Sequence, residues 1–365
     1  MKRILQIYLA LVLLPGLAFA QSPGAFTNTL QRDMQNQHIP ALSVLVFKGN
    51  TTLFEATLGK ANIADNIPLA PTQPFLLASI SKTVTATALM QLYEAGKFAL
   101  DDPINAYLPF PVRIPGYRQE ITFRTLLTHT AAIADGPALD DQYYTGKDSP
   151  VSLRRFLQSY LTPNGQLYDD YDNFYDYAPG EDYTYSNTGY ALIGLLVETI
   201  SGQDFAAYTK RHIFRPLGMS YTNWHLRNIS GRIVQPYDYA RGGYRAIPHY
   251  TFTDYPNGGL HSTARDMHRF LSTFTNGGLL APATIREMIT PQIPSIDPEV
   301  GLGLFLMNPE LGLWGHNGGE QGASTLMAFN PDNGVGAIIL ANQGEAELDG
   351  ILADAYRFGL GLSGG

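Results

Sequence analysis

The chain has 365 residues and a formal net charge of -8 at pH 7, so it is long enough for one large domain, or two lobes, with a sizeable core. It contains no cysteine, which excludes disulfides, thiol nucleophiles and a lipidated N-terminal cysteine. Because the charge balance is acidic and no run of lysine and arginine occurs, we do not expect binding to nucleic acid.

Residues 1–20 have the layout of a secretory signal peptide. The basic residues 1–3 precede an apolar stretch over 4–19, and the small-residue pattern AFA at 18–20 provides a cleavage site. The alternative is a membrane anchor, but the apolar stretch is short for a span. We therefore expect cleavage after Ala20 and a secreted or periplasmic protein without a membrane attachment after the signal is removed.

The next part of the chain predicts a helix followed by a hairpin. A short amphipathic helix is expected over 23–37, and 42–47 and 51–58 have the composition of two strands joined by the turn at 48–50. Residues 227–255 are expected to be irregular. Helical patterns then occur over 79–92, 122–130, 190–197, 264–274, 282–289 and 348–358.

The last hundred residues change to strand-like runs at 302–307, 312–315, 323–329 and 334–340, separated by glycine-rich turns. Such turns favour antiparallel pairing. Strands near both ends of the chain predict an α/β (α+β) fold, with one antiparallel sheet built from the N- and C-terminal segments and flanked by helices. We place this sheet lobe at about 21–75 and 258–365, and an inserted all-helical lobe at about 76–257, with the active site between them.

A serine and a lysine three residues apart lie at the start of the helix expected over 79–92. Residues three apart share one helix face, so Ser79 and Lys82 should be neighbours. The unpaired backbone N–H groups at a helix N-terminus also suit a developing oxyanion. One apolar face of this helix should be buried, and Gly96 should provide its left-handed stop.

A serine hydroxyl becomes a good nucleophile when a base takes its proton. Lysine can act as that base if burial or a neighbouring cation lowers its pKa from about 10.4. The alternative is a helix-capping serine followed by an unrelated lysine. The functional interpretation is favoured because Lys82 lies among apolar residues, and no other lysine of this chain has a serine three residues before it.

Two further motifs could complete an acyl-transfer site. Tyr185-Ser186-Asn187 offers a phenol and an amide at the start of an apolar helix, whereas the other Tyr-x-Asn copies do not open such a helix. The segment 314–319, WGHNGG, borders a strand, and its glycines would let a substrate carbonyl approach backbone N–H donors. No Gly-x-Ser-x-Gly and no His-Glu-x-x-His occurs, which disfavours other hydrolase classes.

Two features have more than one interpretation. His129 could be catalytic, but we interpret it as a hydrogen-bonded structural histidine. The segment 140–185 is dense in tyrosine and aspartate. It is either an acidic aromatic wall over a binding cleft or a solvated surface loop whose rings pack on the body, and the composition favours neither.

The ordered motifs resemble those of the serine β-lactamase and penicillin-binding-protein superfamily, in particular its class C β-lactamase-like branch. That branch includes DD-peptidases, D-aminopeptidases and carboxylesterases. The segment 79–82 resembles the family's Ser-x-x-Lys, 185–187 its Tyr-x-Asn, and 316–318 its Lys/His-x-Gly. The flanking text LLTHT at 126–130 and YSNTGYALIG at 185–194 is also similar, so the resemblance covers nearly the whole of a single catalytic domain at 21–365.

The resemblance implies a role for each matching residue. Ser79 would be the nucleophile and Lys82 its activator, and Tyr185 would be the base that later protonates the leaving group. Asn187 would hold Lys82 and a substrate amide, while the backbone N–H groups of Ser79 and Gly319 would form the oxyanion hole. No metal and no cofactor is implied.

The chain departs from the family pattern at two places. His316 stands where β-lactamases carry a lysine that attracts anionic substrates, and a neutral histidine weakens the case for an efficient β-lactamase. His316, Gly318 and Gly319 are still expected to contact the substrate. After LLTHT, residues 131–133 are Ala-Ala-Ile where relatives usually have Ser-Gly-Leu, so that loop is expected to differ.

These features predict an exported serine hydrolase that acts through a Ser acyl-enzyme on small-molecule esters, amides or peptides, of carboxylesterase or D-amino-acid peptidase type. The alternatives are a class C-like β-lactamase, and a non-catalytic penicillin-binding-type module that senses peptidoglycan. The acidic, tyrosine-rich segment 140–185 also disfavours a strongly anionic substrate.

Overall fold

A computed structural model describes residues 22–229 and 231–363. The signal peptide expected at residues 1–20 lies outside the described residues. Within them, no helix combines the length and the apolar character needed to cross a membrane.

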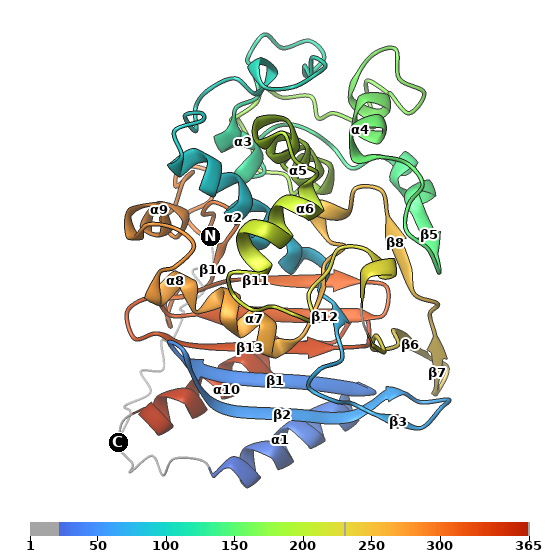
Figure 1. Cartoon of the computed structure of the whole chain (residues 1–365), viewed down its shortest axis with the longest axis vertical. Coiled ribbons are helices and arrows are strands. Elements are labelled where there is room, and N and C mark those ends of the chain that lie inside the picture. Colours follow the sequence, from blue (N-terminus) through green and yellow to red (C-terminus); the bar gives the residue numbers. More distant parts are fainter. Residues whose placement is uncertain (1–21, 230, 364–365) are drawn as a thin grey trace, which may run out of the picture.

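A seven-stranded sheet forms the centre of the molecule, in the order β10-β11-β12-β13-β1-β2-β3 (Figure 1). All its neighbouring strands pair antiparallel. The predicted fold class is confirmed, because the first and last parts of the chain meet where β1 pairs with β13. The strands are β1 (Ala41–Lys48), β2 (Thr51–Asn62), β3 (Ile67–Pro68), β10 (Phe305–Asn308), β11 (Leu313–Glu320), β12 (Ala323–Phe329) and β13 (Val335–Ala341).

Strand β1 separates two hydrophobic cores. Its side chains alternate between the faces of the sheet: Leu42 and Val44 join one core, whereas Leu45 and Phe47 join the other. Helices α1 (Pro23–Asn36) and α10 (Asp349–Ser363) cover the first face, and α7 (Ala264–Leu271) contacts β1 and β13 on the other (Figure 1). Because both faces are covered, the strand is apolar at nearly every position.

The helices between the strands surround α2 (Ser81–Glu94), which contacts α5 (Asn187–Ser201) and α6 (Phe205–Thr209). The apolar face of α2 that we expected to be buried is buried, and so is every other residue from Ser81 to Met90, including Lys82 and three threonines. The helix is therefore enclosed on all sides, and its buried threonine hydroxyls donate to backbone carbonyls. The expected stop at Gly96 is present, with φ +65°. The other helices are α3 (Phe123–Leu127), α4 (Leu153–Leu161), α8 (Thr273–Asn276) and α9 (Pro282–Met288).

The segment expected to be irregular contains regular structure. Strands β6 (Tyr237–Ala240) and β7 (Gly243–Ala246) form a hairpin, and β8 (Tyr250–Phe252) pairs with β5 (Tyr143–Thr145). The β6–β7 turn has positive φ at both Arg241 and Gly242. A two-residue turn with positive φ at both positions suits a twisted hairpin. Its usual first residues are asparagine, aspartate and glycine, so the arginine did not indicate this turn in the sequence.

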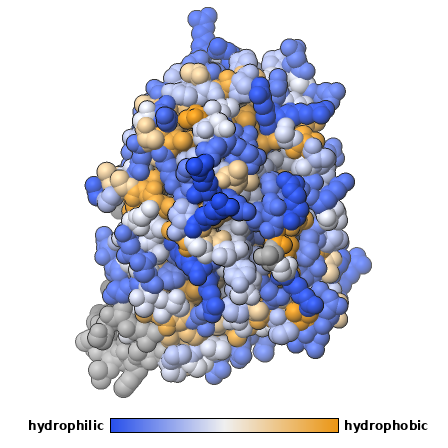
Figure 2. All heavy atoms as spheres, viewed as in Figure 1, coloured by the Kyte–Doolittle hydropathy of each residue, from blue (hydrophilic) through white to orange (hydrophobic). Residues whose placement is uncertain are grey.

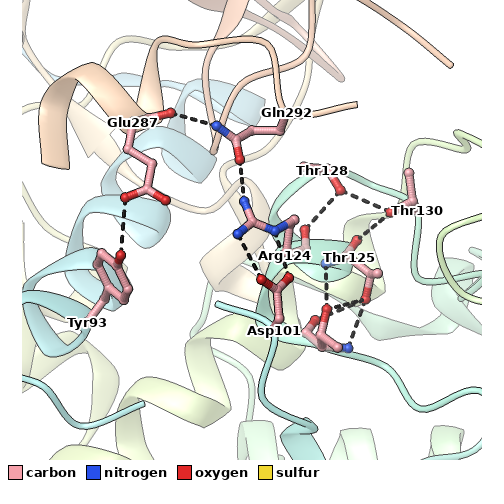
Figure 3. Close-up of polar contacts among 9 residues, drawn as sticks. Tyr93, Asp101, Arg124, Thr125, Thr128, Thr130, Glu287 and Gln292 are labelled. Carbon is pink, nitrogen blue, oxygen red and sulfur yellow. Dashed lines mark hydrogen bonds and ion pairs between the residues drawn. The ribbon is translucent and has the colours of Figure 1, made fainter. Parts of the chain in front are cut away.

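The loop regions next to α3 are tied down by polar contacts (Figure 3). The Arg124 guanidinium donates to both carboxylate oxygens of Asp101, at 2.7 and 3.0 Å, and also to Gln292. Thr128 and Thr130 share a hydrogen bond of 3.0 Å across the residue between them. These contacts fix the turn that carries His129.

Candidate active site

Ser79 lies in a short 3₁₀ turn, η1 (Ala78–Ile80), directly before α2. The turn is held against the sheet, because the Thr325 hydroxyl donates to the Leu77 carbonyl at 2.7 Å. Gly318 of β11 lies so close that a β-carbon there would stand 2.5 Å from the Leu77 carbonyl oxygen and 3.0 Å from the Ser79 nitrogen. Only glycine lets the β11 backbone approach the serine this closely.

Lys82 is fully buried one turn after Ser79, and its amine makes three polar contacts. Nζ lies 3.1 Å from Ser79 Oγ, 2.7 Å from Asn187 Oδ1 and 2.8 Å from the Asn257 carbonyl oxygen. The last two partners can only accept hydrogen bonds. A neutral amine would give its two N–H bonds to them, and its lone pair would then face the Ser79 hydroxyl.

The environment of Lys82 favours that neutral form. Burial lowers the pKa of Lys82 to about 7, while the carboxylates of Asp135, Asp254 and Glu320 act in the opposite direction. A lysine with a pKa near 7 is partly deprotonated at neutral pH. It can therefore take a proton from Ser79.

Tyr185 adjoins both groups. Lys82 Nζ lies 4.7 Å from the centroid of its ring. Burial raises the pKa of the Tyr185 phenol far above its usual range, and its interaction with the Ser79 hydroxyl offsets only part of this. At neutral pH the phenol keeps its proton, so it is suited to donate to a leaving group, whereas Lys82 is the better first base.

The start of α5 places Asn187, and an aspartate that sequence reasoning missed holds that start. Asp135 accepts from the N–H of Asn187 at 2.8 Å, from the N–H of Thr188 at 2.9 Å and from the Thr188 hydroxyl at 2.9 Å. A carboxylate at a helix N-terminus accepts hydrogen bonds from the unpaired N–H groups, and its negative charge interacts favourably with the helix dipole. Asp135 lies 52 residues before Asn187, so no local pattern linked the two.

His129 packs against the ring of Tyr185. It is buried, its Nδ1 accepts from the Ser186 N–H at 3.0 Å, and its ring stacks on the Tyr185 ring with centroids 4.3 Å apart. The contacts support the structural interpretation of this histidine. Ala132, in the departing segment 131–133, has φ +57°, a conformation that glycine adopts with less strain.

His316 also lies next to the ring of Tyr185. It is 1% exposed, its ring centroid lies 6.4 Å from that of Tyr185, and its Nδ1 lies 2.5 Å from the Asn317 carbonyl oxygen. Burial and the nearby Lys82 lower the pKa of His316 to about 3, so it is neutral at pH 7. His316 is not among the residues that form the wall of the cleft over Ser79, whereas Gly319 is.

A cleft of about 500 Å³ opens over the serine. Ser79, Tyr185, Asn187 and Gly319 all border it, so four of the seven predicted site residues share one cavity. Asp140 and Tyr143, from the segment 140–185, also border it, and its other walls come from residues outside the predicted site: Ala78, Asp135, Gly136, Pro137, Leu139, Phe252, Asp254, Asn257, Gly258 and Glu320.

Part of the segment 140–185 forms a wall of the cleft, and part of it is a surface loop. Asp140 and Tyr143 border the cleft, as a wall would. Tyr171, in contrast, is 91% exposed, while Phe174 is buried in the core nearby.

The face of the molecule in Figure 2 is mostly hydrophilic with scattered apolar residues. Figure 1 shows that the helical segments extend above the sheet.

Residues 26–360 match the model of the beta-lactamase family. The chain belongs to the beta-lactamase family. The predicted family is thereby confirmed.

Curated relatives support this assignment. Protein flp from Staphylococcus aureus (strain MW2) is 22% identical over 325 residues, which are 86% of this chain and 61% of that protein. Penicillin-binding protein 4* from Bacillus subtilis (strain 168) is 28% identical over 340 residues, 87% of this chain and 71% of the relative. The chain thus spans less than two thirds of the length of flp.

Solved structures share the fold. A penicillin-binding protein from Bacillus halodurans has a TM-score of 0.71 and 26% identity, covering 92% of this chain and 98% of that one. D-amino acid amidase from Ochrobactrum anthropi has a TM-score of 0.70 and 21% identity, covering 93% and 99%. EstCE1, a hydrolase with promiscuous acyltransferase activity, has a TM-score of 0.71 and 18% identity, with the same coverage of 93% and 99%. At these identities the last two show the fold alone.

Proposed function

We propose that the protein hydrolyses esters or small amides through an acyl-enzyme on Ser79, as a carboxylesterase or D-amino-acid peptidase type of hydrolase. One observation carries the proposal. The amine of Lys82 contacts Ser79 Oγ at 3.1 Å while its two other partners can only accept, which aims the lone pair of the neutral amine at the hydroxyl.

The acylation step follows from this arrangement. Ser79 Oγ attacks the substrate carbonyl carbon and its proton passes to Lys82 Nζ, while the carbonyl oxygen becomes an oxyanion facing the N–H groups of Ser79 and Gly319. When the intermediate collapses, the bond to the leaving group breaks. Tyr185 protonates that group, which departs as an alcohol or amine, and the proton held by Lys82 replaces the one lost from the phenol.

Deacylation reverses the roles. A water molecule attacks the acyl carbon and gives a proton to the Tyr185–Lys82 pair. The bond between the acyl carbon and Ser79 Oγ then breaks, and Oγ takes that proton back. The products are a carboxylic acid and free Ser79, so the cycle consumes one water and needs no other reactant.

Two alternatives receive less support. A β-lactamase would be helped by a cation for the substrate carboxylate, but His316 is buried with a pKa lowered to about 3. A binder without turnover would not need a base with a pKa near 7 beside the serine. The fold shared with D-amino acid amidase and EstCE1 is compatible with amide or ester hydrolysis.

A substrate panel tests the proposal. Hydrolysis of p-nitrophenyl butyrate, a D-alanyl p-nitroanilide and the chromogenic cephalosporin nitrocefin would be measured for the wild type and for Ser79→Ala. We expect ester or D-alanyl turnover that disappears in Ser79→Ala. Turnover of nitrocefin alone would favour the β-lactamase, and the absence of both a penicillin adduct and turnover of any substrate would favour the binder.

We also propose that the protein is exported, because the basic, apolar and small-residue pattern of residues 1–20 has the layout of a signal peptide. Expression of the full chain in a bacterial host, followed by fractionation and N-terminal sequencing, tests this. A mature protein that starts at Gln21 outside the cytoplasm is expected. An intact Met1 on a cytoplasmic protein would contradict it.

A further inference from the structure

The cleft over Ser79 carries charge of one sign. Asp135, Asp140, Asp254 and Glu320 border it, and no lysine, arginine or histidine is among the described residues of its lining. The cleft adjoins a second groove of about 860 Å³, with which it shares Gly319 and Glu320. The described residues that line that groove also include no basic side chain, and they add the carboxylates of Glu345, Glu347, Asp349 and Asp238, the last of which pairs with Arg245 outside the lining.

Existing contacts explain some of these carboxylates. Asp135 is occupied by the start of α5. Both oxygens of Glu320 accept one hydrogen bond each, from the Tyr143 hydroxyl at 3.0 Å and from the Gln321 N–H at 2.9 Å. These are neutral donors, so the charge of Glu320 has no cationic partner there.

Asp254 is the member that points most clearly to a ligand. It is only 6% exposed, yet it borders the cleft. The Asn257 amide donates to Oδ2 at 2.6 Å and the carboxyl also interacts with its own backbone N–H, but none of the described residues forms an ion pair with it. Burial raises the pKa of Asp254 to about 7, because an ionised carboxyl is costly there, and a cation that enters the cleft would favour the ionised form.

The position of Asp254 relates that cation to the reacting bond. Asp254 holds the side chain of Asn257, and the Asn257 carbonyl binds Lys82 Nζ at 2.8 Å. A group bound at Asp254 would therefore lie close to the carbonyl that Ser79 attacks. The described residues contain no cluster of three or more acidic or histidine side chains that could hold a metal ion, so the carboxylates suit an organic cation.

We propose that the substrate of this site carries an ammonium group near the scissile carbonyl, bound between Asp254 and Glu320, as in an aminoacyl ester or amide. This inference rests on the proposed hydrolase function and adds the charge of its substrate. A cleft lined by one sign of charge raises the local concentration of the opposite sign and disfavours like charge.

The bound ammonium would also help the nucleophile. The Asp254 and Glu320 carboxylates favour the protonated form of Lys82. A substrate cation between them neutralises this effect and repels the lysine proton. The free amine of Lys82 is thus favoured when the correct substrate is in place.

Paired substrates test the inference. The values of kcat/KM for glycine ethyl ester and N-acetylglycine ethyl ester would be measured at pH 7.5, above the pKa of about 7 to which burial raises Asp254, and each divided by its rate constant for hydroxide hydrolysis. We expect the normalised ratio to favour the cationic ester by roughly ten-fold or more, and to fall as ionic strength rises. Asp254→Asn and Glu320→Gln should each reduce the ratio several-fold.

Asp332→Asn is the matched control. Asp332 is exposed in the turn between β12 and β13, at the opposite end of β12 from Glu320. The control should keep the wild-type ratio. A ratio of one or below in an enzyme that hydrolyses p-nitrophenyl butyrate through Ser79, or a ratio that neither Asp254→Asn nor Glu320→Gln changes, overturns the inference and leaves the proposed function standing. Absence of Ser79-dependent turnover of every ester overturns both.

Discussion

The backbone carbonyl of Asn257 accepts a hydrogen bond from Lys82 Nζ at 2.8 Å, although the two residues are 175 positions apart. Together with Asn187 Oδ1, this carbonyl uses the two N–H bonds of a neutral amine. The lone pair is then directed to Ser79. The segment 255–257, a Tyr-x-Asn copy that was not assigned to the site, thus helps to orient the Lys82 amine.

Loss of either proton carrier should nearly stop the reaction. We expect Lys82→Ala and Tyr185→Phe each to lower kcat/KM for p-nitrophenyl butyrate by roughly 10²–10⁴-fold, the range typical of a general acid or base. Tyr221→Phe is the control, because Tyr221 is 37% exposed and belongs to another Tyr-x-Asn copy. Equal losses at Tyr185 and Tyr221 would show that the wrong tyrosine has been assigned.

The rate should depend on pH through Lys82. Its pKa is lowered to about 7, so kcat/KM for the uncharged ester should rise with pH through about 7 as the amine loses its proton. Burial also raises the pKa of Asp254 to about 7, so the observed midpoint belongs to the Lys82–Asp254 pair.

Glu320→Gln checks the origin of that midpoint. Glu320 raises the pKa of Lys82, so its neutralisation should move the midpoint to lower pH. The pH–rate profiles of both proteins would be compared between pH 5 and 9. A flat wild-type profile, or a midpoint that moves to higher pH in the variant, would contradict the role of Lys82 as base.

Asp135 should position Asn187 rather than react. Asp135→Ala removes three hydrogen bonds at the start of α5 and should cost about 1–2 kcal/mol of stability, the upper range for a lost helix cap. It should also lower kcat more than Asp135→Asn does, because Asn can still accept from that helix end. Urea unfolding and kcat of both variants decide this, and identical kcat values would exclude the positioning role.

Gly303 should be essential for packing against the catalytic helix. Its φ is +74°, and an added β-carbon would lie 2.3 Å from Cβ of Ala86 on α2. Gly303→Ala should lower the free energy of unfolding by about 2–5 kcal/mol, from left-handed strain and overpacking. Gly202→Ala has a similar φ, +69°, with nothing within 4 Å, so it should show only the strain, about 1–2 kcal/mol. Equal losses would mean that the contact with Ala86 is unimportant.

The sequence predicts the parts of this structure that local patterns encode. The apolar runs of β1 and β13 and the apolar pattern of α5 identify the main elements, and the Ser79–Lys82 spacing places an amine beside a hydroxyl. Strand β11 was predicted to end at residue 315 but continues to Glu320, because its glycines carry no strand preference.

The rest depends on contacts between distant segments. Asp135, Asp254 and Asn257 reach the site only when their loops fold against α2 and α5, and no spacing along the chain links them to Ser79. For the same reason, the sequence did not indicate that His316 would be buried behind Tyr185. Tertiary packing, rather than local preference, decides which polar groups face the cleft.

The most direct test of the central claim is the site of covalent labelling. The protein would be treated with a fluorophosphonate or a fluorescent penicillin, and the labelled peptide identified by mass spectrometry in the wild type, Ser79→Ala and Ser81→Ala. Ser81 faces away from the cleft, since its hydroxyl accepts from the Leu260 N–H at 3.1 Å, so Ser81→Ala should lose stability but keep the label. The label is expected on Ser79 in the wild type and in Ser81→Ala, and absent from Ser79→Ala. A label on Ser81 or any other residue, or labelling that survives in Ser79→Ala, would contradict Ser79 as the nucleophile.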